Sequence, residues 1–573
     1  IELLPYVTAR GEYRFIHPDH PFRSPNDYFF DAGLDLKYRA TSNVTLNATF
    51  NPDFGQVEVD PAVVNLTQFE TFFPERRPFF IEGRELFRFG QIRTYNSFGF
   101  PTAFFSRRIG RALPRFFDYP SLFYDAPNQA RILGAAKITG KTTGGWSLGV
   151  IEALTPREEV ETGSFDFRDR YTLEPFTNYF VGRVGREMRR GNTVAGAYVS
   201  AVNRELDGRA RTSHTVHMRR EAYAGGLDLQ HTWHNRTWAL DASLMASYVA
   251  GSPEAIFSTQ VTPQHYYHRP DARSFHLDTT RTSLSGMAGQ IALTKLAGTH
   301  WLGNIAWQHT TPGFEVNDIG FQNNADRRAL STDLFYRETK AGRLFRNYAG
   351  GVFTNQTWNT DGDIVFNNYS AFLDLNFLNF SGLNFRYDYV APSFDDRLTR
   401  GGPVMRSTRG WVGQAGWFSD QRKRAFGNIN LNYDRYEGGY TSTTVSTNIN
   451  WSPSPTVWIV AGPQFFRVYN PAQFFEGLSR GGPASTYGGR YIFAELDQRE
   501  FSMTARVNWT FSPTLSLQTF LQPLVSAGAW GQSKQLRGAR TFEFDPADLG
   551  PPDDFNVRSL RGNAVLRWEY RPG

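Results

Sequence analysis

Charged residues gather in one stretch of the chain, Asn51–Phe100, that lacks the regular alternation seen elsewhere. Carboxylates and guanidinium groups in such a stretch can pair with charged residues of a surrounding wall, because Arg binds a carboxylate through two hydrogen bonds. The stretch also contains four prolines, which interrupt strands and helices. One interpretation is a plug folded into a larger structure, and the other is a long exposed loop. The candidate plug or gating residues are Asp53, Glu58, Asp60, Glu70, Glu75, Arg76, Arg77, Glu82 and Arg84.

Two arginines are each followed by Gly-Gly-Pro, at Arg400–Pro403 and Arg480–Pro483. Gly-Gly-Pro predicts a tight turn with few backbone donors, so both arginines are presented from a constrained backbone. Such an arginine can clamp a carboxylate or a phosphate. The alternative is a turn whose arginine is tied to the plug or to the wall.

Two sequences resemble catalytic motifs but lack the structural context that those motifs need. Gly477–Gly481 fits a nucleophile elbow, which requires a strand-to-helix turn in an α/β sheet. Ala135–Thr142 has Ala where a phosphate-binding loop has its first glycine, and it predicts a strand that turns at Gly140–Gly145 into a second strand. We identify no catalytic residue and expect no cofactor.

Histidines and paired aspartates are the remaining candidates for metal binding. Several His pairs are spaced by three, which on a strand places the two rings on opposite faces. His265 and His268 fall in a long predicted loop, where a metal site stays open. Pairs of aspartates could offer oxygen ligands to Ca²⁺, although neither matches an EF-hand loop. Surface residues are the alternative in each case, and we predict no metal site. These aspartates are Asp361, Asp363, Asp395 and Asp396.

The composition narrows the class of protein. The 573 residues include no Cys, which excludes a disulfide scaffold, a Cys-ligated metal and a cysteine nucleophile. No run of 18 apolar residues exists, so transmembrane helices are excluded. The chain is polar, with a mean hydropathy of −0.45, yet it has 50 Phe, 26 Tyr and 13 Trp. A dry core alone does not account for so many aromatic residues in so polar a chain.

Apolar and polar residues alternate with period two over long stretches. In Phe501–Phe511 the odd positions are apolar and the even positions are polar, and the same pattern recurs in Thr237–Tyr248, Leu34–Ala40 and Ala425–Asp434. A soluble antiparallel sheet or a membrane barrel produces such strands. Aromatic residues at the strand ends, strands of about ten residues and the alternation of short and long links favour the barrel.

We therefore predict an all-β fold, a large antiparallel transmembrane β-barrel of about 24 strands, within a range of about 22 to 26, with long extracellular loops. A barrel of this size needs a filled lumen, so we expect residues 51–100 to fold partly inward. The long loops are expected near 154–175, 203–218, 249–282, 310–328, 391–409, 468–488 and 523–559. The last predicted strand, Asn563–Tyr570, ends at a turn signal, Arg571–Gly573. We expect the closing strand to lie beyond it.

The run from Asn51 to Leu66, followed by Phe69–Gly83, resembles the signature of an uncharacterised bacterial family. Phe104–Gly110 and the two Arg-Gly-Gly-Pro segments are similar to later landmarks of that family. The resemblance covers essentially the whole chain. It implies one outer-membrane β-barrel domain over residues 1–573, usually found C-terminal to a family-9-like carbohydrate-binding domain. It implies no activity and no catalytic residues.

Three functions remain open at this point. The first is a channel or receptor in the bacterial outer membrane for a glycan or another polar or anionic solute. The second is a structural anchor that displays a binding domain or holds outer-membrane or periplasmic proteins. The third, an outer-membrane hydrolase, needs a catalytic cluster that the sequence does not reveal. Only seven of the 61 basic residues are Lys, and Arg suits wall–plug pairing, lipopolysaccharide phosphates or an anionic solute. The basic residues are dispersed, so we expect no nucleic-acid binding.

Overall fold

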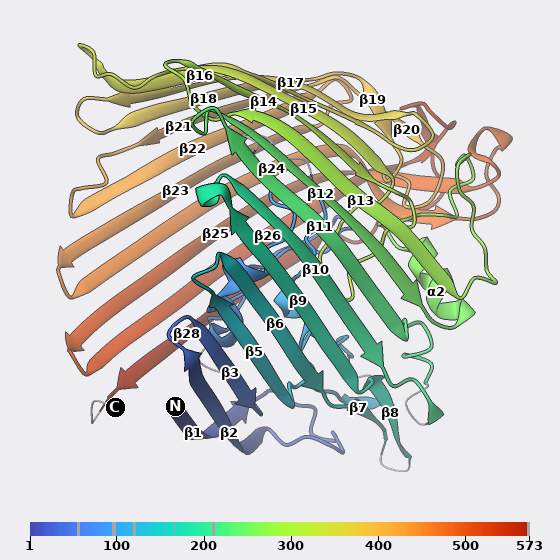
Figure 1. Ribbon diagram of the computed structural model, residues 1–573. Coiled ribbons are helices and arrows are strands. Elements are labelled where there is room, and N and C mark those ends of the chain that lie inside the picture. Colours follow the sequence, from blue (N-terminus) through green and yellow to red (C-terminus); the bar gives the residue numbers. More distant parts are fainter. Residues whose placement is uncertain (54–57, 94–98, 118–121, 165–166, 209–211, 570–573) are drawn as a thin grey trace.

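The computed structural model describes residues 1–53, 58–93, 99–117, 122–164, 167–208 and 212–569. Its dominant feature is one antiparallel sheet of 23 strands that curves round on itself (Figure 1). From β1 to β26 each strand pairs with the next one of the sheet along the chain, and β26 pairs with both the short β27 and β28. The all-β class is confirmed, and the strand count lies inside the predicted range.

The strands of the main sheet have the following bounds: β1 (Glu2–Tyr13), β2 (Asn26–Thr41), β3 (Val44–Phe50), β5 (Gly134–Lys141), β6 (Trp146–Thr155), β9 (Thr177–Met188), β10 (Thr193–Arg204), β11 (Glu221–Trp233), β12 (Trp238–Ala250), β13 (Ser283–Lys295), β14 (Trp301–Thr310), β15 (Arg327–Glu338), β16 (Phe345–Trp358), β17 (Ile364–Phe377), β18 (Gly382–Val390), β21 (Gly410–Phe418), β22 (Ala425–Tyr436), β23 (Thr441–Ser454), β24 (Val457–Leu478), β25 (Arg490–Ser512), β26 (Leu515–Leu536), β27 (Phe544–Pro546) and β28 (Phe555–Trp568).

Smaller elements lie in the connections. They are β4 (Phe123–Asp125), β7 (Glu158–Gly163), β8 (Arg168–Glu174), β19 (Ser393–Asp395), β20 (Met405–Ser407), α1 (Pro78–Ile81), α2 (Pro253–Val261), η1 (Arg84–Phe87), η2 (Ser106–Arg108), η3 (Arg189–Gly191) and η5 (Ala484–Thr486). None of the helices formed by the described residues has the length and apolar character that a membrane span requires.

Burial along the strands is inverted relative to a soluble protein. In β12, Asp241 is fully buried and Ser243 is 7% exposed, whereas the adjacent Leu244 is 52% exposed. Since successive side chains point to opposite faces, the polar set lines the inner face of the curved sheet and the apolar set covers its outer face. The alternation read from the sequence is confirmed, and its apolar face is the one turned outward.

The strand ends form two opposite sides of the sheet, here named the short-turn edge and the long-loop edge. They differ in their connections and in their aromatic residues. Strand pairs are joined by short turns at one edge, such as 234–237 and 455–456, and by long loops at the other, such as 251–282 and 391–409. The predicted alternation of short and long links is therefore confirmed. Exposed tryptophans gather at the short-turn edge: Trp146, Trp233, Trp301, Trp417, Trp451, Trp458, Trp509 and Trp568.

Two of the predicted loops are wrong in extent. Strands β24, β25 and β26 run for 22, 23 and 22 residues, so most of 468–478 and 523–536 is strand. Register shifts near Asn470 and Ala494 interrupt the two-residue alternation, which hides the continuation from a sequence pattern. The projecting parts are held by a separate apolar cluster of Met405, Ala472, Phe474, Phe493 and Leu536.

The first and last strands of the sheet form its two margins. Within the described residues, β1 pairs with β2, β28 pairs with β26, and no ladder joins β1 to β28. The closing strand stays a prediction, and the turn signal Arg571–Gly573 lies outside the described residues.

A charge on the outer face tests whether that face meets lipid. Leu244→Arg places a guanidinium near the middle of β12, where a bilayer midplane penalises Arg by about 2–4 kcal/mol. We expect this variant to lose assembly into lipid vesicles, measured by heat-modifiable gel mobility. His234→Arg, in the turn before β12, is the control and should assemble normally. Normal assembly of the Leu244→Arg variant would contradict a lipid-facing surface.

Candidate functional site

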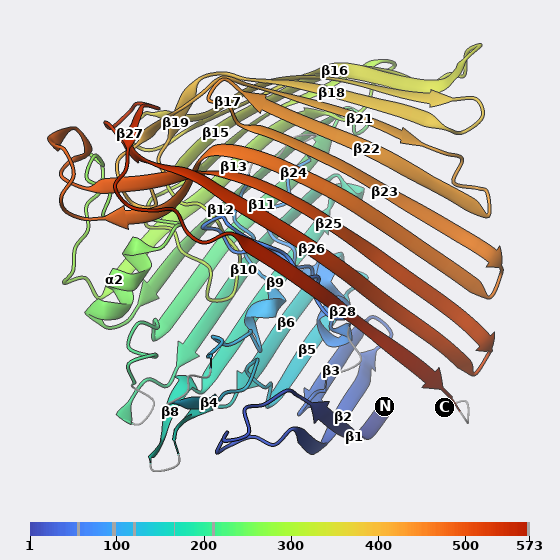
Figure 2. The ribbon, with the colours of Figure 1, turned by 180° about the vertical axis from the view of Figure 1, so that it is seen from behind.

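Residues 51–133, here named the β3–β5 segment, connect two neighbouring strands but cross between opposite parts of the curved sheet (Figures 1 and 2). Three of its stretches, 54–57, 94–98 and 118–121, lie outside the described residues. The first two of these belong to the predicted plug, residues 51–100. On the β25–β26 side, Glu58 pairs with Arg506 at 2.7 Å. The backbone N–H of Ala62 donates to Gln522 Oε1 at 2.7 Å.

On the opposite side, the β3–β5 segment binds the inner face of β9–β13. Arg93 donates to Asp241 from its backbone N–H at 2.7 Å and from its guanidinium at 2.5 Å. The backbone N–H of Gly90 donates to Asp228, which also receives two 2.7 Å hydrogen bonds from Arg183. The segment thus compensates the buried carboxylate of Asp241, as burial of a charge requires, whereas the charge partner of Asp228 is Arg183 of the wall.

An apolar core reinforces these polar contacts. Phe80 and Phe87 of the segment are almost fully buried, and they pack in one cluster with inward residues of β5–β13 and with the loop 311–326. The members from the segment are Phe80, Phe87, Ala103, Ile109 and Ile132, and those from the loop are Phe314, Val316 and Ile319.

Most of the predicted plug residues form ion pairs. Arg76 pairs with Glu58, Arg107 holds Asp60 through hydrogen bonds of 2.6 and 2.8 Å, and Arg108 holds Glu70 at 2.8 and 3.0 Å. Glu82 reaches the wall, where Lys37 of β2 donates to it at 2.8 Å. These pairs fix the shape of the segment and attach it to β2 and β25.

Of the remaining predicted plug residues, two are exposed and two pair with each other within the segment. Asp53 and Arg84 are exposed. Glu75 accepts hydrogen bonds from Arg77 at 2.6 Å and from the Ser106 hydroxyl at 2.6 Å. Burial opposes ionisation of Glu75, but these donors outweigh it and hold the pKa of the carboxyl below its usual range. The Glu75–Arg77 pair therefore stabilises the segment itself.

The two Arg-Gly-Gly-Pro turns share a positive φ at their first glycine, but their arginines have different roles. Gly401 and Gly481 have φ of +98° and +84°, a conformation that favours glycine. Arg400 donates to the carbonyl of Leu66 at 3.0 Å and lies over the ring of Phe474, so it binds the β3–β5 segment. Arg480 is exposed in the loop after β24.

The long-loop edge is held together by buried ion pairs that the sequence pattern missed. Asp318 accepts hydrogen bonds of 2.7 Å from both Arg204 and Arg219; Asp318 and Arg204 are buried and Arg219 is half-buried. Arg204 ends β10, Arg219 lies in the connection from β10 to β11, and Asp318 lies in the loop 311–326, so no local spacing could have revealed the cluster. Desolvation raises the pKa of Asp318, but the two guanidinium groups outweigh it and lower the pKa to about 2.

The candidate metal ligands are occupied by protein contacts. His265 bonds the Pro312 carbonyl at 2.8 Å and Glu315 at 2.9 Å. Asp396 accepts from Arg327 at 2.6 Å, and Asp361 accepts from backbone and side chain of Ser274. Among the residues that the structure describes, no group of three or more potential ligands is arranged to hold a metal ion.

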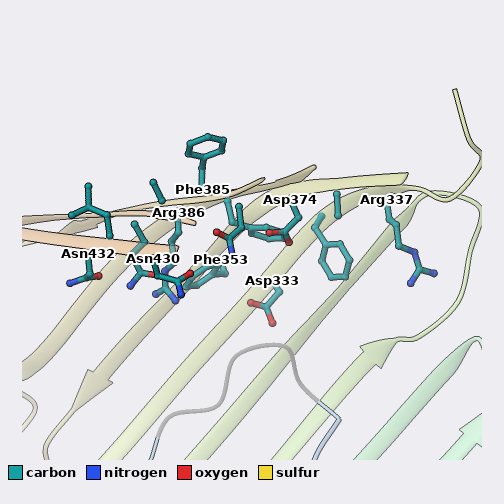
Figure 3. Close-up of a pocket in the computed structure, with 15 residues that line it drawn as sticks. Asp333, Arg337, Phe353, Asp374, Phe385, Arg386, Asn430 and Asn432 are labelled. Carbon is teal, nitrogen blue, oxygen red and sulfur yellow. The ribbon is translucent and has the colours of Figure 1, made fainter. Parts of the chain in front are cut away.

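A cavity of about 720 Å³ lies along the inner face of the sector β15–β22. Its lining combines carboxylates, guanidinium groups, amides and phenyl rings. Figure 3 shows Asp333, Phe353, Arg386 and Asn430 on the inner side of the strands, whereas Phe385 points away from it. Further lining residues are Phe335, Arg337, Phe372, Asp374, Asn384, Gln414 and Asn432.

Comparison with known proteins places the chain in a family. A family model described as "Domain of unknown function (DUF5916)" matches residues 1–573. The chain belongs to this family. The predicted membership of an uncharacterised family is thus confirmed. The carbohydrate-binding domain expected beside the barrel stays a prediction. No curated protein matches the chain.

The DUF5916 chain is similar in structure to several solved receptors. A mutant ferric enterobactin receptor (PfeA) from Pseudomonas aeruginosa gives a TM-score of 0.42 at 9% identity, covering 91% of this chain and 74% of that chain. The siderophore receptor PirA from Acinetobacter baumannii gives 0.39 at 7%, covering 91% and 75%. The outer membrane transporter YddB from Escherichia coli gives 0.33 at 9%, covering 76% and 62%.

Removing one wall carboxylate should loosen the segment. Asp241→Asn replaces a charged hydrogen-bond acceptor of Arg93 by a neutral one. We expect this to weaken binding of the segment to the wall by about 1.5–3 kcal/mol. We expect faster trypsin cleavage at Arg88 and Arg93. Asp434→Asn is the matched control, because Asp434 lies on the inner face of β22 and accepts hydrogen bonds from two wall residues, Asn432 and Ser442. Equal cleavage of both variants would contradict the role of Asp241.

The Asp318 network should make stability depend on pH. A carboxyl whose pKa is lowered by folding, here from 3.8 to about 2, stabilises the protein above pH 3.8 and loses that contribution as the pH falls through about 2. Asp318→Asn removes the charge partner of the buried Arg204 and the nearer of two partners of Arg219, which costs about 3–5 kcal/mol. The difference in unfolding temperature between the two proteins should shrink from pH 6 to pH 2, with Asp553→Asn as an exposed control. A difference independent of pH would contradict this account.

Proposed function

We propose that this chain spans a bacterial outer membrane as a β-barrel and acts as a channel or receptor for a polar solute, a glycan or another polar or anionic compound. The outward apolar face supports contact with lipid, and lipopolysaccharide would meet the long-loop edge. The exposed tryptophans at the short-turn edge support an aromatic belt at one membrane interface.

One observation carries the solute function: the inner wall has two different sectors. The sector β9–β13 is covered by the β3–β5 segment through the Arg93–Asp241 ion pair, a hydrogen bond from Gly90 to Asp228 and an apolar core. The sector β15–β22 borders a cavity with polar and aromatic lining, in the size range of ligand pockets. We infer that the segment is a plug, and that solute passes along the sector that the plug leaves uncovered.

A structural anchor is the second candidate, and the buried core of the segment favours it. A segment held by so many apolar and ionic contacts could fill the lumen permanently while the barrel displays a carbohydrate-binding domain or holds partner proteins. The two functions differ in one property, which is whether the segment moves. Our proposal includes no catalytic step.

A reversible tether tests movement of the segment. The chain has no Cys, so introduced cysteines are the only thiols. A Cβ on Gly83 would lie 3.5 Å from Cβ of Thr139 in β5, within the range for disulfides. In Gly83→Cys/Thr139→Cys we expect single-channel openings in planar bilayers under reducing conditions and their loss on oxidation.

The control is a disulfide within the wall. Gly145→Cys/Glu187→Cys joins a turn to β9, with a Cβ–Cβ distance of 3.6 Å and a similar positive φ at the glycine. Oxidation of this pair should leave the openings unchanged. Openings that persist in the oxidised Gly83–Thr139 tether would contradict a moving plug. If every form is silent, including one that lacks residues 51–100, the anchor function is correct.

A further inference from the structure

Gly416 marks a gap in the inner wall into which two amides project. It lies on β21 opposite Asn384 of β18 and Asn430 of β22. A Cβ on Gly416 would fall 1.9 Å from Asn384 Oδ1 and 2.7 Å from Asn430 Oδ1. The missing side chain is therefore what allows the two amide oxygens to converge in front of the strand.

Aromatic rings and further hydrogen-bonding groups border these amides. Asp374 is opposite Asn384 in the register of β17 and β18. The rings of Phe353 and Phe372 lie 6.5 Å apart with 43° between their planes, and the Arg386 guanidinium lies 4.5 Å from the Phe353 ring centre. Amides both donate and accept hydrogen bonds, carboxylates accept them, and ring faces pack against apolar C–H groups.

The charges of the lining balance. Among the lining residues of the cavity, two aspartates, Asp333 and Asp374, stand against two arginines, Arg337 and Arg386. Arg386 also forms an ion pair with Asp388 at 2.9 Å. The cavity therefore offers no excess of positive charge to an anion, in contrast to an arginine-rich anion site.

We propose that the cavity at Gly416 binds a neutral polyhydroxylated solute, an oligosaccharide, through Asn384, Asn430 and Asp374 with its apolar sugar faces on Phe353 and Phe372. Hydroxyl groups both donate and accept, as this set of partners requires, and a site built for hydroxyls discriminates strongly against ligands that lack them. The inference rests on the proposed function only for the route by which the sugar reaches the cavity.

Isothermal titration of the full chain in detergent tests the site, with maltohexaose and cellohexaose as neutral probes and hexagalacturonate as the anionic probe. We expect saturable binding of at least one neutral hexamer and weaker binding of the anionic one. Asn430→Leu should raise Kd about three- to tenfold, which corresponds to one lost hydrogen bond. Gly416→Ala should raise Kd at least as much, because the added Cβ displaces both amides.

The matched control is Gly413→Ala on the same strand. Gly413 faces outward, and the nearest atom to its added Cβ is 4.0 Å away, so binding should be unchanged. If neither neutral hexamer binds, if hexagalacturonate binds more tightly, or if Gly416→Ala and Asn430→Leu bind like the unmodified chain, the proposal is wrong. If the chain binds a sugar but never conducts, the proposed binding site stands and only the channel function is wrong.

Discussion

The structure depends on the compensation of charges that its inverted sheet turns inward. With the apolar side chains outside, carboxylates such as Asp241 and Asp228 are enclosed by the curved wall, where an uncompensated charge costs several kcal/mol. The partners come from the β3–β5 segment and from neighbouring strands. Folding of the wall and binding of the segment are therefore coupled, because each has polar groups that the other satisfies.

The same constraint explains why the inner wall has two sectors. Where β9–β13 carry carboxylates, the segment supplies Arg93 and backbone N–H groups. Where β15–β22 carry amides together with aspartates and arginines that balance in charge, water or a solute can satisfy the wall, and the cavity lies there. At the long-loop edge, Asp318 and Asp396 use buried arginines to hold the loops together. Movement of the segment must break charged contacts on one sector while the other keeps its shape.

The sequence predicts the features of the fold that repeat along the strands. Alternation in Phe501–Phe511 and in Thr237–Tyr248 marks β25 and β12 and their two faces, since burial depends on strand parity alone. The sequence pattern missed the extensions of β24 and β26, because bulges change which of two alternate residues faces inward. Charge density marked residues 51–100 as a unit, but no local pattern could reveal that Glu58 meets Arg506 or that Arg204, Arg219 and Asp318 converge. Those contacts join residues far apart in sequence, and only the closing curvature of the sheet brings them together.

In the arrangement inferred here, the β3–β5 segment covers one sector of the inner wall and leaves the other open to solvent. In this Cys-free chain, single cysteines at Ser243, which is buried against Gly90, and at Asn430, which is exposed in the cavity, report on the two sectors. The measurement is the rate of labelling of the folded protein in lipid vesicles by a membrane-impermeant maleimide. We expect rapid labelling of the cysteine at 430 and slow labelling of the cysteine at 243, which becomes rapid when residues 51–100 are deleted. Equal rates in the intact chain would contradict it.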